Sequence, residues 1–311
     1  MFKLTPSCKD YIWGGNKLKT DFGKKFDGNP LAETWELSCH PDGPSYVTED
    51  GKELTLREYI DKHGKQVLGK NCEKFEDFPV LIKFIDAKGN LSVQVHPSDD
   101  YALKNEGQYG KTEMWYVVDC EEGACLYFGF KQDITTEEFE ERIKNNTLLE
   151  VLNKVPVKKG DVFFIESGTL HAIGEGIIIA EIQQNSNLTY RVYDYGRIGK
   201  DGKPRELHIE KAVKVTKCEK VKYKSFAPDL GKCKYFKVDK IYLDGQYSKT
   251  LTGNVDDSSF LHILVLDGKA TVTNGGNTVS VQKGDSLFIP ANAGEYTIEG
   301  EIEALTTVIP E

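Results

Sequence analysis

Several side chains near the middle of the sequence are of types that bind a divalent metal ion. In the segment 91–97, LSVQVHP, polar residues alternate with apolar ones. A strand with this alternation places Ser92, Gln94 and His96 on one face. Such a face is either exposed to solvent or directed into a barrel, where its three polar groups would form a metal or substrate site.

Two further residues complete a possible metal site. Glu113 enters a strongly apolar segment, and His171 follows a glycine turn and another apolar segment. Taken alone, each has a simpler interpretation: Glu113 as a surface residue in an ion pair, His171 as a loop histidine and Gln94 as a solvated strand residue. Their joint position at strand ends favours one shared site, because imidazole and carboxylate groups suit Zn²⁺ with one coordination position left open.

The segments that carry these residues predict a mainly β protein. Short apolar runs separated by turn signals are typical of strands. They occupy residues 80–86, 91–95, 114–119, 124–130, 161–166, 176–184 and 189–195. Helical patterns are fewer: 56–69, a short turn after Ser98, and 134–153, where Thr135 or Thr136 can cap an acidic first turn. We interpret the segment 134–153 as a helical insertion in a β domain.

An internal repeat indicates two related β-barrels. The string VPVKKGDVFFI at 155–165 recurs as VSVQKGDSLFI at 279–289. In each copy a glycine, Gly160 or Gly284, makes a tight turn before an aspartate and a buried strand. A polar, lysine-rich stretch around 218–236 is then the expected boundary between the two barrels.

This boundary predicts a metal-binding catalytic domain over 1–235 and a degenerate C-terminal domain over 236–311. In the second copy of the repeat, Glu295 takes the position of His171, and no Gln-x-His motif precedes it. We therefore expect no metal in the C-terminal domain.

Composition and charge exclude several classes of protein. The 311 residues are 39% hydrophobic and 29% charged, and no apolar run approaches the twenty or so residues of a membrane-spanning helix. A net charge of −9 weighs against nucleic-acid binding and requires that any anionic substrate be held by local lysines or arginines. The seven irregularly spaced cysteines, and an N-terminus without a secretory signal, favour the cytoplasm.

The region around His171 resembles the second metal-binding motif of the cupin superfamily. In that motif a turn glycine is followed at fixed spacing by a proline, a glycine and a histidine. Gly160, Gly168 and His171 match it, whereas Glu166 stands where proline is usual. The polar residues between 94 and 113 resemble the first cupin motif with an insertion. The resemblance implies two cupin-type (jelly-roll) β-barrels with short helical insertions.

Longer segments resemble type I mannose-6-phosphate isomerases, in the short bacterial form that lacks a large helical domain. The segments are AETWELSCHPDG (32–43), FPVLIKFIDAKGNLSVQVHPSDDYA (78–102), GKTEMWYVV (110–118), GTLHAIGEG (168–176) and IAEIQQNSNLTYRVYDYGR (179–197). The similarity runs in order through nearly the whole chain and is most specific from 78 to 197.

This resemblance implies an enzyme that interconverts mannose 6-phosphate and fructose 6-phosphate with one Zn²⁺ per chain. The implied zinc ligands are Gln94, His96, Glu113 and His171. The implied catalytic residues are Lys111, Glu181 and Arg191, and the implied substrate-binding residues are Ser92 and Arg197. Longer relatives carry a lysine at the position of Arg197.

The chemistry of such a reaction supports these assignments. Moving a proton between C1 and C2 through an enediolate requires a base and a cation that stabilises charge on oxygen. Glu181 or a metal-associated group could take the proton, although a buried carboxylate paired with a neighbouring cation is an equally simple role for Glu181. If residues 189–197 are extended, Arg191 and Arg197 share one face and could both bind phosphate.

Two rival functions are an isomerase of another sugar phosphate and a catalytically silent sugar-phosphate-binding protein with the same fold. We favour an enzyme because a binding module would not need Lys111, Glu181 and Arg191 together with four metal ligands. In either case the partner is a small sugar phosphate rather than a nucleic acid or a membrane.

Overall fold

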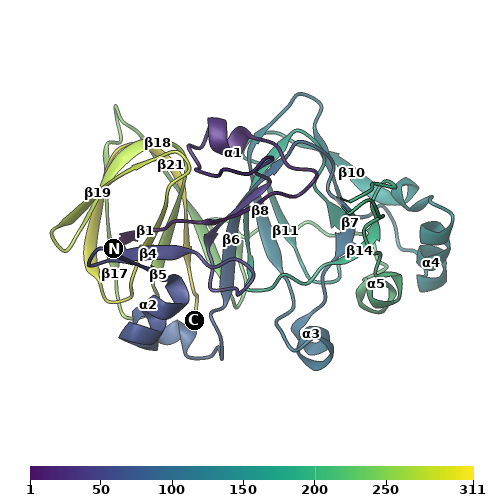
Figure 1. Ribbon diagram of the computed structural model, residues 1–311, viewed down its shortest axis with the longest axis horizontal. Coiled ribbons are helices and arrows are strands. Elements are labelled where there is room, and N and C mark those ends of the chain that lie inside the picture. Colours follow the sequence, from purple (N-terminus) through teal and green to yellow (C-terminus); the bar gives the residue numbers. More distant parts are fainter. Residues whose placement is uncertain (200) are drawn as a thin grey trace.

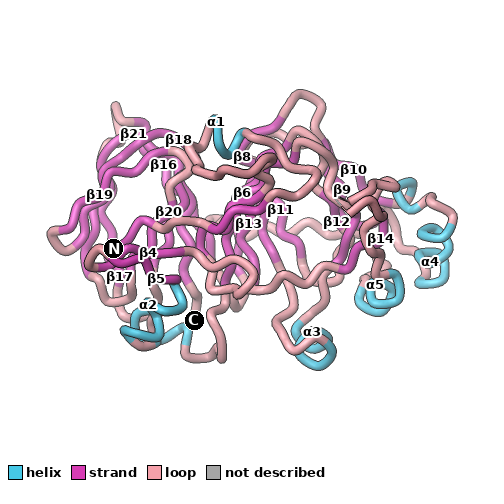
Figure 2. Tube along the Cα trace, viewed as in Figure 1, coloured by secondary structure: helices cyan, strands magenta, loops and turns pink. Residues whose placement is uncertain are grey.

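The strands of the computed structural model, which describes residues 1–199 and 201–311, form three large sheets (Figure 1, Figure 2). The mainly β architecture predicted from the sequence is confirmed. A six-stranded sheet lies in the middle, with a five-stranded sheet on one side and an eight-stranded sheet on the other (Figure 1). The N-terminus lies among the strands of the C-terminal sheet (Figure 1).

The six-stranded and five-stranded sheets pack against each other, and we refer to this pair as the first barrel and to the eight-stranded sheet as the second. The six-stranded sheet contains, in spatial order, β11 (Val162–Ile165), β8 (Glu113–Cys120), β13 (Ile177–Gln184), β6 (Val80–Ala87), β3 (Glu33–Leu37) and β2 (Ser7–Lys9). The five-stranded sheet contains β10 (Leu152–Pro156), β9 (Cys125–Phe130), β12 (His171–Ala172), β7 (Val93–Val95) and β14 (Tyr190–Tyr193).

The third sheet is built mostly from the C-terminal residues. Its path is β1 (Phe2–Lys3), β20 (Ser286–Ile289), β18 (Leu261–Asn274), β21 (Gly294–Val308), β16 (Lys237–Asp244) and β15 (Gly231–Lys232), with β17 (Thr250–Val255) on β21 and β19 (Asn277–Gln282) on β18. A separate hairpin pairs β4 (Tyr46–Glu49) with β5 (Lys52–Thr55). Two strands from outside residues 236–311, β1 and β15, therefore contribute to this sheet.

Helices are short and lie at the margins of the sheets. They are α1 (Lys17–Thr20), α2 (Leu56–His63), α3 (Asp99–Asn105), α4 (Thr136–Lys144) and α5 (Ile209–Val215), with 3₁₀ turns η1 (Lys65–Leu68), η2 (Lys70–Cys72) and η3 (Leu148–Glu150). Among the described residues, none of these helices has the length and apolar character needed to cross a bilayer.

Two predicted helices are shorter than their sequence patterns. The segment 56–69 forms α2 only as far as His63, because Gly64 leaves the helix with a φ of 85°. The segment 134–153 forms α4, whose first turn is capped by the Thr135 hydroxyl, and then a 3₁₀ turn and the start of β10.

The central sheet is covered on both faces, which explains its uninterrupted apolar strands. Every residue of β6 and of β13 is buried. Ile85 and Ile179 face the five-stranded sheet and pack in one cluster with Phe128, whereas Ile82 and Ala180 pack in a second cluster with residues of the C-terminal sheet. A strand buried on both faces needs no polar alternation. A charged residue on such a strand must therefore be paired inside the protein.

The sequence repeat corresponds to a repeat in the structure. Gly160 and Gly284 have φ values of 90° and 92°, and their N–H groups donate to Val117 O and Val265 O at 2.8 and 2.9 Å. Each glycine leads into a strand, β11 or β20, that pairs antiparallel with its neighbour. A side chain at either position would be strained, because φ is positive.

Candidate active site

A row of polar side chains crosses the central sheet on the face that points into the first barrel. In the strand register Trp35 is opposite Lys83, Lys83 is opposite Glu181, and Glu181 is opposite Trp115. Neighbouring strands hold directly opposed side chains within contact distance. Four strands, β3, β6, β13 and β8, thus place a lysine and a glutamate between two tryptophans.

A second row crosses the facing five-stranded sheet. Gln94 on β7 is opposite both His171 on β12 and Arg191 on β14. Val93 and Val95, on the other face of β7, pack in the cluster that includes residues of α4 and α5. The alternation in LSVQVHP therefore directs its polar face into the barrel, and the alternative of a solvent-exposed polar face is wrong.

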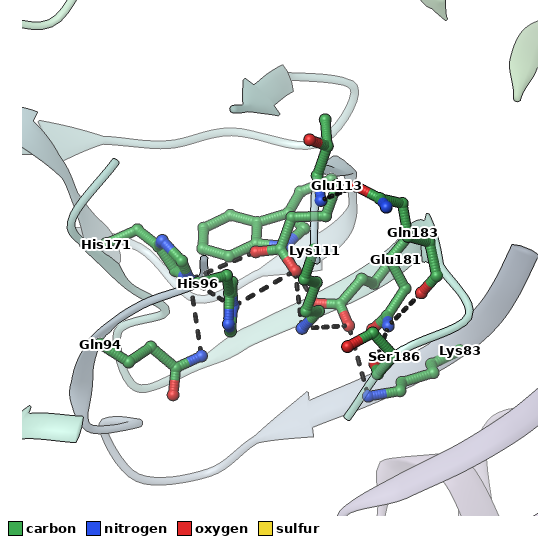
Figure 3. A network of polar contacts seen from close by, with 12 residues as sticks. Lys83, Gln94, His96, Lys111, Glu113, His171, Glu181, Gln183 and Ser186 are labelled. Atoms are coloured by element: carbon green, nitrogen blue, oxygen red, sulfur yellow. Dashed lines mark hydrogen bonds and ion pairs between the residues drawn. The ribbon is translucent and has the colours of Figure 1, made fainter. Parts of the chain in front are cut away.

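His96, Glu113 and His171 meet between the two sheets (Figure 3). All three are buried, with at most 1% of their surface exposed. The two imidazole Nε2 atoms are 3.1 Å apart, and the Glu113 carboxylate lies 3.6 Å from His96 Nε2 and 3.3 Å from His171 Nε2. The N–H of Gly168 donates to His96 O at 2.8 Å and so ties the loop before His171 to His96.

The other ring nitrogens fix which atoms of the two histidines carry protons. His96 Nδ1 lies 2.6 Å from Leu188 O, and His171 Nδ1 lies 2.8 Å from Thr169 O. Because a carbonyl oxygen only accepts, each Nδ1 donates and each Nε2 presents a lone pair. Burial lowers the pKa of His171 to about 4, so the ring is neutral near pH 7.

This arrangement fits a divalent cation. Two facing lone pairs 3.1 Å apart repel each other unless a cation lies near both. Neither oxygen of Glu113 accepts a hydrogen bond of normal geometry within the described residues, although Lys111 Nζ lies 2.7 Å from Oε2. Burial raises the pKa of Glu113 to about 7, and the charge of Glu181 adds to this rise. A bound cation would remove the cost of burying this carboxylate.

Gln94 borders the same group from the five-stranded sheet. Its amide nitrogen lies 3.5 Å from His171 Nε2, and its amide oxygen accepts from the Ser92 hydroxyl at 3.3 Å. A metal ion binds the oxygen of an amide, so ligation by Gln94 requires rotation of the amide group.

Charged side chains continue from the three-residue group through Lys111 and Glu181 to Lys83 (Figure 3). Lys111 Nζ lies 2.7 Å from Glu113 and 3.5 Å from Glu181. Lys83 Nζ lies 3.5 Å from both Glu181 and Glu33. Three carboxylates and two ammonium groups therefore alternate in one chain of ion pairs. Each member is more than nine-tenths buried, so its charge is compensated by its neighbours rather than by water.

Glu181 is held in its ionised form by this chain. Burial alone would raise the pKa of Glu181, but the positive charges of Lys111 and Lys83 and the hydrogen bond from Trp115 lower it below its usual value. The Trp115 indole donates to Oε2 at 3.0 Å. Oε1, which faces the two lysines, is the oxygen better placed to interact with a substrate.

The charged chain borders a cavity of about 270 Å³. The cavity is lined by Tyr11, Trp13, Glu33, Lys83, Ile85, Leu91, Ser92, Gln94, Lys111, Ile173, Glu181, Asn187, Thr189, Arg191 and Arg205. Its lining includes Gln94 and Lys111, which contact the three-residue group, but not His96, Glu113 or His171 themselves. The three lie just behind the wall that a substrate would touch.

The structure brings together eight of the nine predicted site residues. Arg197 is the exception, because among the described residues it neither lines the cavity, as Ser92, Gln94, Lys111, Glu181 and Arg191 do, nor belongs to the buried group of His96, Glu113 and His171. The expectation of an extended segment with Arg191 and Arg197 on one face is wrong: β14 ends at Tyr193, and Tyr195 has a φ of 58°. This turn directs the chain away from the strand before it reaches Arg197.

The sequence interpretation did not assign roles to Glu33, Lys83 or Arg205. Lys83 and Glu33 carried a usable signal, since each is a charged residue in a strand whose neighbours are all buried. Arg205 carried none, because no strand or helix pattern in the sequence contains it.

Comparisons with known proteins agree with the fold. Residues 1–127 match the family model for the catalytic domain of type I phosphomannose isomerase, and residues 229–309 match that for the cupin domain of mannose-6-phosphate isomerase. Mannose-6-phosphate isomerase ManA of Bacillus subtilis is 36% identical over 97% of this chain and 96% of its own length.

Solved structures extend the comparison. The crystal structure of the mannose 6-phosphate isomerase from Bacillus subtilis has a TM-score of 0.89, is 34% identical and covers 98% of each chain. A mannose 6-phosphate isomerase crystallised with zinc and yttrium, only 18% identical, shares the fold over the full length of both chains with a TM-score of 0.78. With a relative this similar over nearly its whole length, the chain belongs to the type I mannose-6-phosphate isomerase family.

Proposed function

We propose that this protein is a zinc-dependent isomerase that interconverts mannose 6-phosphate and fructose 6-phosphate. The observation that supports this most directly is the buried His96–Glu113–His171 group, joined by ion pairs to Glu181 on a cavity that also presents Arg191. One end of such a cavity can bind a phosphate and the other can carry out a proton transfer. The family relatives carry the same activity in their names.

We propose one Zn²⁺ per chain, held by His96, Glu113 and His171 with Gln94 as a further ligand. Two imidazoles and a carboxylate with an open position are a usual ligand set for catalytic zinc. When bound, the ion would polarise a substrate oxygen and stabilise negative charge on it.

The chain's own residues would then control the proton. Glu181 is ionised, so its Oε1 can accept the proton from C2 of mannose 6-phosphate and return it to C1 of the ketose. The ammonium groups of Lys111 and Lys83, each 3.5 Å from Oε1, can donate to the oxygens that become negatively charged in the enediolate. The proton taken from C2 is given to C1 and the hydroxyl proton of O2 moves to O1, so the carbonyl group passes from C1 to C2 and no oxidant or reductant is needed.

A direct test is a coupled assay with mannose 6-phosphate and other aldose phosphates. We expect turnover of mannose 6-phosphate to exceed that of the others and to be lost after chelation. Activity restored by Zn²⁺ would support the proposal. Absence of turnover with zinc-loaded protein would reject it in favour of a silent binding protein, and a preference for another aldose phosphate would reject the substrate assignment.

Arg191 is the proposed phosphate-binding arginine of the catalytic set. Its Nε donates to the Ser92 hydroxyl at 3.2 Å and its Nη1 to Glu206 O at 2.9 Å, so two neutral acceptors hold the guanidinium in place. We expect Arg191→Lys to lower kcat/KM by about 2 to 4 kcal/mol, because a lysine cannot replace the planar two-pronged contact. Steady-state kinetics and metal analysis would check this; wild-type kinetics would show that Arg191 has only a structural role.

We also propose that residues 1–235 form the catalytic domain and that residues 236–311 serve as a structural partner. In the second barrel Leu261 is opposite Ile289, the register position that Glu113 holds opposite Ile165 in the first. An apolar side chain at this position cannot bind a metal.

The free thiol state of all seven cysteines supports a reducing compartment such as the cytoplasm.

This division predicts that Glu295, the counterpart of His171, has no catalytic role. Glu295 is exposed at the start of β21. We expect Glu295→Ala to leave kcat, KM and metal content within about two-fold of wild type, because exposed positions tolerate substitution. A selective loss of turnover at unchanged thermal stability, or a second metal ion per chain, would contradict the division.

A further inference from the structure

Three arginines and one aspartate lie together at the end of the cavity away from the metal group. Asp194 is 6% exposed and accepts hydrogen bonds from both Arg197 and Arg205. Arg191 lies on β14, which ends at Tyr193, directly before Asp194. Arg191 and Arg205 line the same cavity, and burial and then the positive charge of Arg205 lower the pKa of Arg191.

Arg205 reaches the cavity with part of its guanidinium free. Its Nε and Nη2 donate to the two oxygens of Asp194 at 2.7 and 2.5 Å, a paired contact that fixes the plane of the group. Its Nη1 makes no hydrogen bond to any residue in 1–199 or 201–311. Arg205 lines the cavity together with Ser92, Thr189 and Arg191.

Arg197 is occupied in a different way. Its Nη1 donates to Asn90 O, its Nη2 donates to Asp194, and its guanidinium lies over the Tyr195 ring at 5.4 Å. Arg197 is not one of the described residues that line the cavity. These contacts suit a residue that braces Asp194 and the turn after β14.

The charges at this end of the cavity are not balanced. Arg197 and Arg205 share the buried carboxylate of Asp194, Arg191 donates to neutral oxygens, and the nearby Glu206 side chain is 84% exposed. The local charge is therefore about +2 in a protein whose net charge is −9. A phosphate monoester carries about −1.5 to −2 near neutral pH, which matches this excess.

We propose that Arg205 is a second phosphate-binding residue, acting beside Arg191, and that Asp194 and Arg197 position it. The inference rests on the proposed function for the identity of the sugar, but its ligand chemistry is that of any phosphate dianion. Arg205 binds the phosphate through its free Nη1, while Asp194 prevents the side chain from rotating out of the cavity. This contact is made equally in the ground state and the transition state, so it contributes to KM rather than to kcat.

The test compares Arg205→Gln with Arg197→Gln and with Arg142→Gln. The last variant removes the same charge from α4, where Arg142 pairs with Glu138 and Glu150 outside the cavity. We expect Arg205→Gln to raise the KM for mannose 6-phosphate and the inhibition constant of inorganic phosphate by about ten-fold, with kcat changed less than three-fold. Arg197→Gln should raise both constants less, and Arg142→Gln should match wild type.

Unchanged phosphate inhibition in Arg205→Gln, or a larger effect of Arg197→Gln, would overturn the inference. Arg205→Lys provides a second measurement that does not depend on turnover: inorganic phosphate should raise the unfolding temperature of the wild type more than that of this variant. An equal rise in both proteins would also overturn it. If the wild type binds inorganic phosphate through Arg205 but does not isomerise mannose 6-phosphate, the proposed function fails and this inference stands.

Discussion

Replacing both His96 and His171 with alanine is expected to remove the bound metal and nearly all turnover. The two Nε2 lone pairs converge at 3.1 Å, and no other described group of histidine, cysteine, aspartate and glutamate side chains comes close enough to hold an ion. We expect metal content to fall from about one ion per chain to near zero. We expect kcat/KM to fall roughly a thousand-fold or more, because stabilisation of oxygen charge by a metal ion is worth several kcal/mol.

Two further variants separate loss of metal from loss of structure. His63→Ala is a matched control, because His63 ends α2 and pairs with Glu49 at the surface. It should retain metal and activity. Glu113→Gln keeps the shape of a buried ligand while removing its charge, so it should fold and yet bind zinc more weakly. Full metal content in the double histidine variant, or full turnover in metal-free protein, would show that the ion lies elsewhere or is not needed.

Local patterns in the sequence predicted much of this site because they follow from strand geometry. The two-residue period of LSVQVHP placed Ser92, Gln94 and His96 on one face, and the structure directs that face into the barrel. The glycine turn of the repeat has the same geometry in both barrels, because Gly160 and Gly284 both adopt a positive φ. Glycine adopts this conformation more readily than any other residue, so the repeated glycine predicted the turn.

Contacts between distant strands could not be predicted in the same way. Lys83 lies in an apolar run, but its two carboxylate partners come from β3 and β13, and only the sheet order brings them together. The substrate-binding role of Arg197 was implied by the family resemblance, and only its shared face with Arg191 depended on counting residues along an extended strand. One left-handed residue, Tyr195, invalidates that count, and no periodic pattern in the sequence marks it.

Glu181→Gln is expected to abolish most of the proton transfer while leaving the metal in place. The amide has the same shape as the carboxylate but cannot accept the C2 proton, so we expect kcat to fall by about 10²- to 10⁴-fold. Metal content should be unchanged, because among the described residues Glu181 makes no hydrogen bond or ion pair with His96, Glu113 or His171 and is joined to them through Lys111 and Trp115. The protein should still fold, since Lys111 keeps its contact with Glu113 at 2.7 Å and Lys83 keeps Glu33 at 3.5 Å.

Glu33→Gln distinguishes a proton acceptor from a carboxylate that only balances charge. Glu33 also pairs with Lys83, lines the same cavity and accepts from the Trp35 indole at 2.8 Å, as Glu181 does from Trp115. It differs in that, among the described residues, Lys111 forms ion pairs with Glu181 and Glu113 but not with Glu33. Both variants therefore lose one negative charge, whereas only Glu181→Gln loses the proposed acceptor of the C2 proton.

The proton itself provides the deciding measurement. Wild-type protein in deuterated water should incorporate deuterium at C2 of mannose 6-phosphate, Glu33→Gln should do so within about ten-fold of the wild-type rate, and Glu181→Gln should not. Equal losses of exchange in the two variants would mean that Glu181 acts through its charge on Lys83 and Lys111. Because the positive charges of Lys111 and Lys83 and the hydrogen bond from Trp115 keep the pKa of Glu181 low despite its burial, its carboxylate is a weak base. Its effectiveness would then depend on the enediolate being stabilised at the moment of transfer, which ties the base to the neighbouring metal group.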